Sequence, residues 1–168
     1  MKRKIGFTLL AFLLITNLSF AQNKLKIGLS GSIQNDQFGI SVPMWLGEKF
    51  VLSPAIDFKY AEKIGSDLSI GLSPRFYLKK DKLSPYFGLN IGIAVNMPSS
   101  DNKVDTETKV DKIVGMAFGA EYFITDNFSV GIEAEGNFTK SAKNSNRFGN
   151  PGGLNFNTGT MIMATIYF

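Results

Sequence analysis

Apolar and polar residues alternate with a period of two along most of the chain. The last run shows the pattern clearly, because Thr160, Ile162, Ala164, Ile166 and Phe168 occupy one phase and Thr165 and Tyr167 occupy the other. Alternation of this kind is typical of β-strands that have one apolar face. No segment beyond the N-terminal region has the period of a helix, so the remainder is predicted to be all-β.

The alternating segments are long and are separated by Gly, Asn, Asp and Lys. Their ranges are Lys24 to Gln34, Gln37 to Leu46, Phe50 to Tyr60, Asp67 to Lys79, Ser84 to Met97, Val110 to Ile124, Phe128 to Thr139 and Leu154 to Phe168. Each meets or exceeds the roughly 9 to 11 residues that a tilted strand needs to cross a bilayer. Residues 22–168 are therefore predicted to form one domain, an eight-stranded antiparallel up-and-down transmembrane β-barrel.

The composition of the two faces predicts which one points inward. One face carries large apolar residues, such as Phe87, Leu89 and Ile91, and the other is crowded with Gly, Ala, Ser and Asn. Small side chains suit the narrow interior of an eight-stranded barrel, so the apolar face is expected to contact lipid.

Aromatic residues on the apolar face gather at the strand ends. Phe50, Phe76, Phe87, Tyr122, Phe128 and Phe168 are expected at the periplasmic rim, and Phe38, Tyr60, Phe138 and Phe156 at the outer rim. Such girdles are typical of membrane barrels.

Connections between the predicted strands alternate between short and long, except for a two-residue hairpin turn expected at Asn35 and Asp36.

The N-terminus has the three parts of an export signal. Lys2, Arg3 and Lys4 precede an apolar stretch from Ile5 to Ile15, and Ser19-Phe20-Ala21 resembles a cleavage site. Residues 1–21 are predicted to be a cleaved signal peptide, and the chain is expected in the outer membrane. Phe168 is expected to act as an assembly signal there.

Charge and missing residue types exclude several functions. Three of the 18 basic residues and none of the 14 acidic ones lie in the predicted signal, so the mature part carries a net charge of about +1. This balance argues against nucleic-acid binding. The chain has no Cys and no His, which removes disulfides and the usual bases and metal ligands. No catalytic residue, cofactor or metal is predicted.

Two stretches resemble a known family. Gly119 to Glu135 follows the hairpin pattern G-x-E-Y-x-x-T-D-N-x-S-x-x-x-E, and Pro85 to Gly92 resembles a fifth strand of the same family. The family is that of small outer-membrane β-barrels, which includes the OmpA membrane domain, OmpX and the opacity-type "porin family" proteins. The resemblance implies a barrel in the envelope of a Gram-negative cell, and it implies no single activity.

Charged residues on the inward phase are expected to form a structural cluster in the lumen. They are Lys26, Asp57, Arg75, Lys79, Glu121, Glu133 and Glu135. If Ile124 pairs with Phe128 across the turn at residues 125–127, Glu121 lies diagonally close to Glu133 on the neighbouring strand. A carboxylate pair can serve as acid and base in glycosidases. Neutralisation of buried carboxylates by Arg75 and the lysines is the preferred interpretation.

The long loops offer two weaker candidates. Asp101, Asp105, Glu107 and Asp111 lack the spacing of a calcium loop, and the lysines between them favour an ordinary solvated loop. Lys140, Lys143 and Arg147 could contact lipopolysaccharide phosphates, although a flexible loop is the preferred interpretation. Trp45 is expected to fill the lumen near the periplasmic rim.

The function predicted from these features is that of a non-catalytic integral membrane protein. Its outer loops are expected to contact a partner or to support the envelope. The expected partners are outer-membrane lipid, lipopolysaccharide and the barrel-assembly machinery, with an unknown surface partner and a monomeric state. The alternatives are a narrow porin-like channel and a soluble lipid-binding barrel.

Overall fold

The computed structural model describes residues 26–99, 107–145 and 149–168. The predicted signal peptide and its boundary at residue 22 lie outside the described residues. The strands are β1 Gly28–Gln34, β2 Gln37–Ser41, β3 Met44–Trp45, β4 Phe50–Ala61, β5 Gly65–Tyr77, β6 Leu83–Pro98, β7 Lys109–Thr125, β8 Phe128–Lys140 and β9 Leu154–Tyr167. None of the described residues forms a helix long and apolar enough to cross a membrane.

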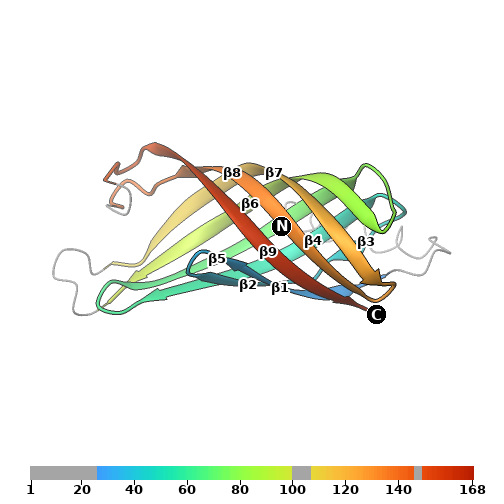
Figure 1. Cartoon of the computed structure of the whole chain (residues 1–168). Helices are drawn as coiled ribbons and strands as arrows, with labels where there is room; N and C mark the ends of the chain where they lie inside the picture. The colour runs from blue at the N-terminus through green and yellow to red at the C-terminus, as the bar shows by residue number, and fades with distance from the viewer. Residues whose placement is uncertain (1–25, 100–106, 146–148) are drawn as a thin grey trace, which may run out of the picture.

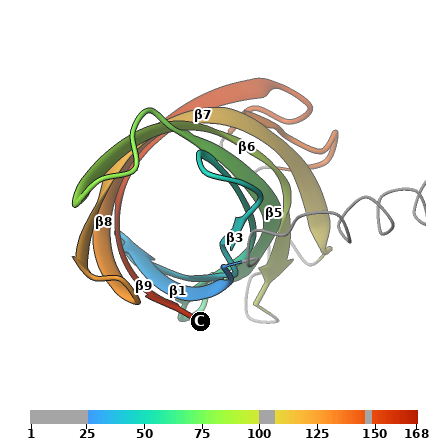
Figure 2. The same cartoon turned by 90° about the vertical axis from the view of Figure 1, so that its right-hand side faces the viewer.

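The strands close into a single antiparallel barrel (Figure 1 and Figure 2). From β4 to β9 each strand pairs with the next one in the chain, and β2 and β3 both pair with β4. β1 pairs with β2 and closes the ring against β9 from Gly28↔Tyr167 to Ile33↔Ile162. The predicted eight-stranded up-and-down fold is therefore confirmed.

The second of the eight barrel strands is divided into β2 and β3 by Val42 and Pro43. Pro43 has no backbone N–H, so the ladder loses one donor at this point. Its carbonyl still accepts a hydrogen bond of 2.8 Å from the Gly28 N–H, and the Val42 N–H donates to the Pro54 carbonyl over 2.9 Å. The interruption is local, and β2 and β3 together act as one of the eight strands of the barrel.

Large apolar side chains face outward. Along β7, Val114, Met116 and Phe118 are exposed, whereas Ala117 between them and Glu121 beyond them are buried. The same alternation holds in the other long strands. A protein in water would not leave such a surface uncovered, which agrees with a wall that faces lipid.

The predicted aromatic residues lie on this outer surface near the two rims. Phe50, Phe76, Phe87, Tyr122 and Phe168 are exposed at the end where β9 finishes, and Phe38, Tyr60, Phe138 and Phe156 at the loop end. Phe128 is only partly exposed. Rings from adjacent strands touch at both ends, with centroids 5.4 Å apart for Phe76 and Phe87 and 4.9 Å apart for Phe138 and Phe156.

The β7–β8 hairpin differs from the prediction at its tip. Thr125, and not Ile124, faces Phe128, because a bulge shifts the register between Phe123 and Thr125. A bulge inserts one unpaired residue and restores the ladder beyond it. Glu121 therefore still faces Gly131, and Glu133 is still its diagonal neighbour, as predicted.

Candidate functional site: the barrel lumen

Five of the predicted charged residues come together inside the barrel. Asp57 lies on β4, Arg75 on β5, Glu121 on β7, and Glu133 and Glu135 on β8. The alternation of each strand turns these side chains inward, and the barrel brings strands that are far apart in sequence around one narrow axis. Arg75, Glu121 and Glu133 are almost completely buried.

Arg75 and Glu133 form an ion pair near the middle of the lumen. Arg75 Nη2 lies 3.1 Å from Glu133 Oε2, and both side chains are less than a tenth exposed. The guanidinium also lies 5.1 Å from the ring centroid of Tyr86, and its Nη1 is 3.5 Å from Met163 Sδ. The Tyr86 hydroxyl donates to Glu133 over 2.6 Å, so this carboxylate is held by a cation and a donor.

Glu121 is held by three hydroxyl groups. Tyr77 donates to its Oε2 over 2.5 Å, Tyr167 donates to its Oε1 over 2.8 Å, and Ser129 also donates to its Oε1. Hydrogen bonds from hydroxyl groups stabilise the carboxylate in a space with little water.

Aromatic rings and the buried ion pair fill the inner half of the lumen. The ring centroids of Trp45 and Tyr77 are 4.6 Å apart, and those of Tyr77 and Tyr86 are 5.0 Å apart. These rings pack with Val51, Met163 and Tyr167. The prediction that Trp45 fills the lumen near this rim is confirmed by its burial.

Two of the predicted cluster residues do not enter the centre of the lumen. Lys26 lies at the inner mouth, where its Nζ donates to the Asp126 carbonyl and sits 4.7 Å from the ring centroid of Tyr167. Burial, together with the nearby Lys80, lowers the pKa of Lys26. The placement of Lys79 in the cluster is wrong, because β5 ends at Tyr77 and the alternation stops there. Lys79 is exposed and pairs with Asp81 at 3.6 Å.

The outer half of the lumen contains a polar cavity of about 360 Å³. Asp57 and Glu135 line it together with amides and hydroxyl groups, among them Asn90, Asn137 and Thr139. Glu135 Oε2 accepts hydrogen bonds from Asn137 Nδ2 over 2.9 Å and from Gln34 Nε2 over 3.4 Å. A smaller cavity of about 50 Å³ lies beside Arg75 and Glu133.

The surroundings of Glu121 and Glu133 fit a structural role for the two carboxylates better than an acid–base role. Both carboxylates are engaged by tyrosine hydroxyls, and neither lines the larger cavity. A glycosidase needs its carboxylates on either side of a substrate, and the rings of the inner lumen occupy that space.

The acidic residues of the outer loops are not gathered into a metal site in the part that the structure describes. Asp101 and Asp105 lie outside the described residues. Glu107 accepts a hydrogen bond of 3.0 Å from Asn144 Nδ2, and buried Asp111 accepts one of 2.8 Å from the Ala142 N–H. Lys140 and Lys143 are exposed, and Arg147 lies outside the described residues.

Sequence reasoning missed the tyrosines and Ser129 as partners of the carboxylates. The signal was present, because Tyr77, Tyr86, Ser129 and Tyr167 share the inward phase with Arg75 and Glu121. Attention to charged residues alone overlooked the hydroxyl groups that a buried carboxylate needs.

Comparison with known proteins places this fold in a family. The family model for the outer membrane protein beta-barrel domain matches residues 16–161. No curated protein matches the chain. The N-terminal β-barrel domain of Pseudomonas aeruginosa OprF is similar, with a TM-score of 0.61 and 13% identity, over 88% of this chain and 98% of that one. Neisserial surface protein A (NspA) is similar with a TM-score of 0.56 and 14% identity, over 86% of this chain and 94% of that one. The TM-scores show a shared fold. The match of the family model over most of the sequence shows that the chain belongs to the outer membrane protein beta-barrel domain family.

Proposed function

We propose that this protein is a non-conducting, non-catalytic barrel of the outer membrane that acts through its outer end. The observation that carries the proposal is the filled inner half of the lumen. Trp45, Tyr77, Tyr86 and Tyr167 belong to one buried cluster, and Tyr86 contacts both residues of the buried Arg75–Glu133 pair. An eight-stranded barrel is just wide enough for such side chains, so they occupy the cross-section that a solute would need.

The two alternatives are less well supported. A narrow porin-like channel needs a continuous path, whereas the cavity of about 360 Å³ is confined to the outer half of the lumen. A soluble lipid-binding barrel would carry its apolar residues inside, whereas the large apolar side chains of this chain face outward. The family match also contradicts the soluble alternative.

The proposal is tested by conductance. Protein folded into planar bilayers should give no stable porin-like current, and Tyr77→Ala with Arg75→Ala should raise the frequency of small currents by removing two parts of the filling. A variant with Phe118→Ala, which shortens a lipid-facing side chain, is the matched control and should behave like the unchanged protein. Reproducible large currents from the unchanged protein would contradict the filled lumen.

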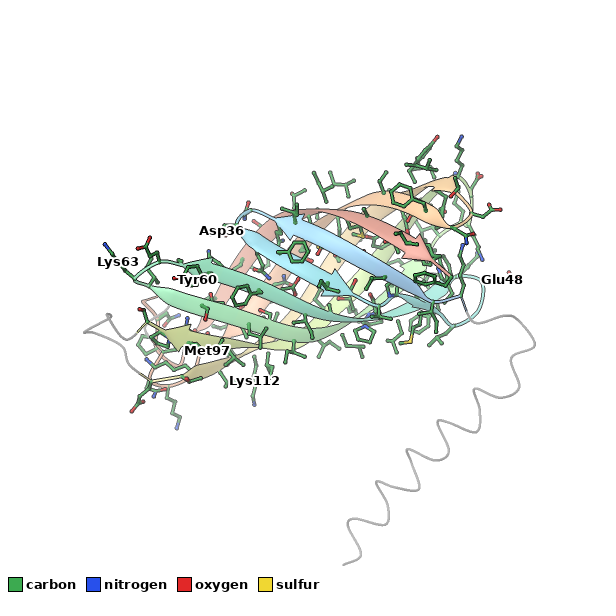
Figure 3. The ribbon with its side chains drawn as sticks, turned by 90° about the horizontal axis from the view of Figure 1, so that it is seen from below. Asp36, Glu48, Tyr60, Lys63, Met97 and Lys112 are labelled. Atoms are coloured by element: carbon green, nitrogen blue, oxygen red, sulfur yellow. The ribbon has the colours of Figure 1, made fainter. Side chains whose placement is uncertain are left out.

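We also propose a contact with lipopolysaccharide phosphates at the outer rim. Lys112 and Lys140 lie directly opposite each other on β7 and β8, and both are exposed. The Lys140 Nζ donates to the Gly152 carbonyl over 2.6 Å, which leaves its other N–H groups for a phosphate. Lys112 points away from the barrel (Figure 3). About ten residues separate Lys112 from Tyr122 of the inner rim, which corresponds to about 25 Å along the membrane normal and places it near the head groups.

Like charges directly opposite each other repel unless an anion lies between them. The outward neighbours of this pair are apolar, with Val114 and Phe138 on one side and Leu154 on the other. Replacing both lysines by Gln should therefore weaken binding of lipopolysaccharide to the purified protein, whereas Lys63→Gln in the β4–β5 turn should not. Equal binding by both variants would contradict the contact.

A further inference from the structure

The β1–β2 hairpin ends below its neighbours on the loop side of the barrel. Pairing of β1 with β9 stops at Ile33↔Ile162, although β9 begins at Leu154. Figure 1 shows this hairpin ending before the β4–β5 and β8–β9 hairpins, and Figure 3 shows Asp36 at its tip set back from Lys63. The barrel wall therefore has a notch, which we define as the gap above residues 35–36 and beside residues 154–161 of β9.

One side of the notch is an open strand edge. In an antiparallel ladder, alternate residues turn both backbone groups to the same neighbour. The Phe168 N–H bonds to Ile27 beside β1, whereas the Tyr167 N–H bonds to Asn127 on the β8 side. The even-numbered residues of β9 therefore face the notch, and above Ile162 they are Thr160, Thr158, Phe156 and Leu154.

These backbone groups have no strand partner among the described residues, because this part of β9 pairs with β8 alone. An unpaired edge is a template for the addition of another strand. Unsatisfied backbone groups at the border of a membrane are costly, which increases the gain from such a partner.

The notch borders the acidic cavity of the outer lumen. Gln34 and Gln37 of the hairpin and Asn157 and Gly159 of β9 line the cavity, and they also lie at the border of the notch. Asp57 and Glu135 are the charged residues of this lining, which contains no Lys or Arg. Two cations of the neighbouring strands are already engaged, since Lys59 pairs with Asp36 at 2.9 Å and Arg75 pairs with Glu133 at 3.1 Å.

A buried donor below the cavity also lacks a partner. Ser53 Oγ is buried and has no hydrogen bond, and it lines the smaller cavity of about 50 Å³ together with Asp57 and Glu135. The Gln34 amide, by contrast, reaches Glu135 over 3.4 Å and occupies the space beside Gly159. Gln34 thus supplies a neutral donor in a position where a cation would bind the carboxylate more strongly.

We propose that the notch binds an extended, basic segment of a partner polypeptide. The segment adds as a strand to the open edge of β9 and directs a Lys or Arg into the cavity toward Asp57 and Glu135. Strand addition supplies affinity through main-chain hydrogen bonds, and pockets for alternate side chains supply specificity. The inference deepens the proposed function, on which it rests, by naming the chemistry of the partner.

A second copy of the chain fits the notch less well. Its own edge, residues 154–161, contains no charged residue and so offers nothing to Asp57 and Glu135. A basic partner satisfies both the backbone edge and the carboxylates, which is why charge complementarity favours it.

The test uses a defined peptide and the full protein folded in lipid nanodiscs. The probe is a fluorescent peptide of alternating Thr and Lys, and the control peptide has Glu in place of Lys. The unchanged protein should bind the first peptide and not the second. Asp57→Asn with Glu135→Gln should weaken binding by about tenfold or more, because each removes one charge that the Lys side chain meets.

Thr160→Pro tests the edge, because it removes an N–H that faces the notch and leaves the bonds to β8 intact. It should also weaken binding by about tenfold or more. Val114 pairs with strands on both sides, so a Pro at this position would break the sheet and is not a useful control. Val114→Thr, on the lipid face, is used as the control variant and should bind the peptide normally. Folding of every variant is checked by heat-modifiable migration on gels.

The absence of Cys permits a second readout. With an added two-electron oxidant such as diamide, the thiol of a single Thr158→Cys should form a disulfide with a peptide that carries one Cys, and the thiol of Val114→Cys should not. Binding that ignores both the carboxylates and Thr160→Pro would overturn the proposal, as would Thr158→Cys crosslinking to a second copy in the absence of peptide. A conducting barrel that still binds the peptide would contradict the proposed function alone.

Discussion

Arg75 governs the charge balance of the inner lumen. Its guanidinium contacts Glu133, the ring of Tyr86 and the sulfur of Met163, and these groups surround it with almost no exposure to solvent. A buried carboxylate is costly unless it is paired, so Glu133 depends on this one cation. Glu121 is instead stabilised by hydrogen bonds from three hydroxyl groups.

Replacing Arg75 by Ala should therefore destabilise the barrel strongly. The change leaves Glu133 buried without its cation, which typically costs about 3 to 5 kcal/mol of unfolding free energy. Lys82→Ala is the control, because Lys82 is an exposed residue near the ring of Tyr122 and should contribute about 0 to 1 kcal/mol. Urea unfolding in lipid vesicles measures both.

Replacing the pair together separates charge from packing. Arg75→Met with Glu133→Leu should recover part of the lost stability, because similar volume is kept and no lone charge remains. A loss from Arg75→Ala no larger than that from Lys82→Ala would show that water reaches Glu133 and that the ion pair is not essential.

At the scale of the strands, the alternating pattern predicted most of the architecture. The inward and outward faces, the pairing of the last strand with the first and the diagonal placement of Glu121 and Glu133 follow from a period of two and from turn positions. The bulge at Ile124 and the interruption at Pro43 did not follow, because they depend on how neighbouring strands meet. Lys79 was misplaced because the pattern does not show where a strand ends.

Close contacts between strands make some glycines indispensable. A Cβ on Gly119 of β7 would lie 2.5 Å from the Tyr86 hydroxyl oxygen and 2.7 Å from the Ile132 carbonyl oxygen. Gly119→Ala should therefore displace Tyr86 from Glu133 and lower stability by about 1 to 3 kcal/mol.

Gly31→Ala on β1 is the matched control, because nothing lies within 4 Å of the added Cβ. It should leave stability unchanged or raise it by about 0.5 kcal/mol through backbone entropy. Urea unfolding in vesicles gives both values, and the fluorescence of the buried Trp45 would report the displaced tyrosine layer. Equal values for the two glycines would mean that β7 and β8 adjust to the added methyl group.

At the scale of the whole molecule, the lumen has two different halves. The inner half is filled by aromatic rings and paired charges, and the outer half holds a polar cavity beside a notch in the wall. The sequence predicted a charged lumen but not this division, because it depends on which inward residues reach the same height after the strands tilt. The two-residue turn of the β1–β2 hairpin at Asn35 and Asp36 was predicted, but the open edge of β9 appears only when the register is known.

Closure of the barrel provides the last prediction, and it concerns Phe168. Its N–H donates to the Ile27 carbonyl over 2.8 Å, and its ring is exposed at the inner rim, beside the pairing of β9 with β1. Phe168→Asp keeps the backbone bond and replaces the lipid-facing ring by a charge. It should reduce the fraction of heat-modifiable, protease-resistant protein in the outer membrane of cells and leave processing of the N-terminus unchanged.

Phe156→Asp is the matched control for that experiment, because it places the same charge on the same strand at the outer rim. If closure at the inner rim controls assembly, Phe168→Asp should reduce the yield more than Phe156→Asp does. Folding into vesicles without cellular factors then separates two causes. A variant that folds normally in vesicles but fails in cells would assign Phe168 a role in recognition by the assembly machinery, whereas failure in both would assign it a role in closing β9 against β1. Normal yield in both settings would show that Phe168 has neither role, and that the remaining pairs of β1 and β9 close the barrel by themselves.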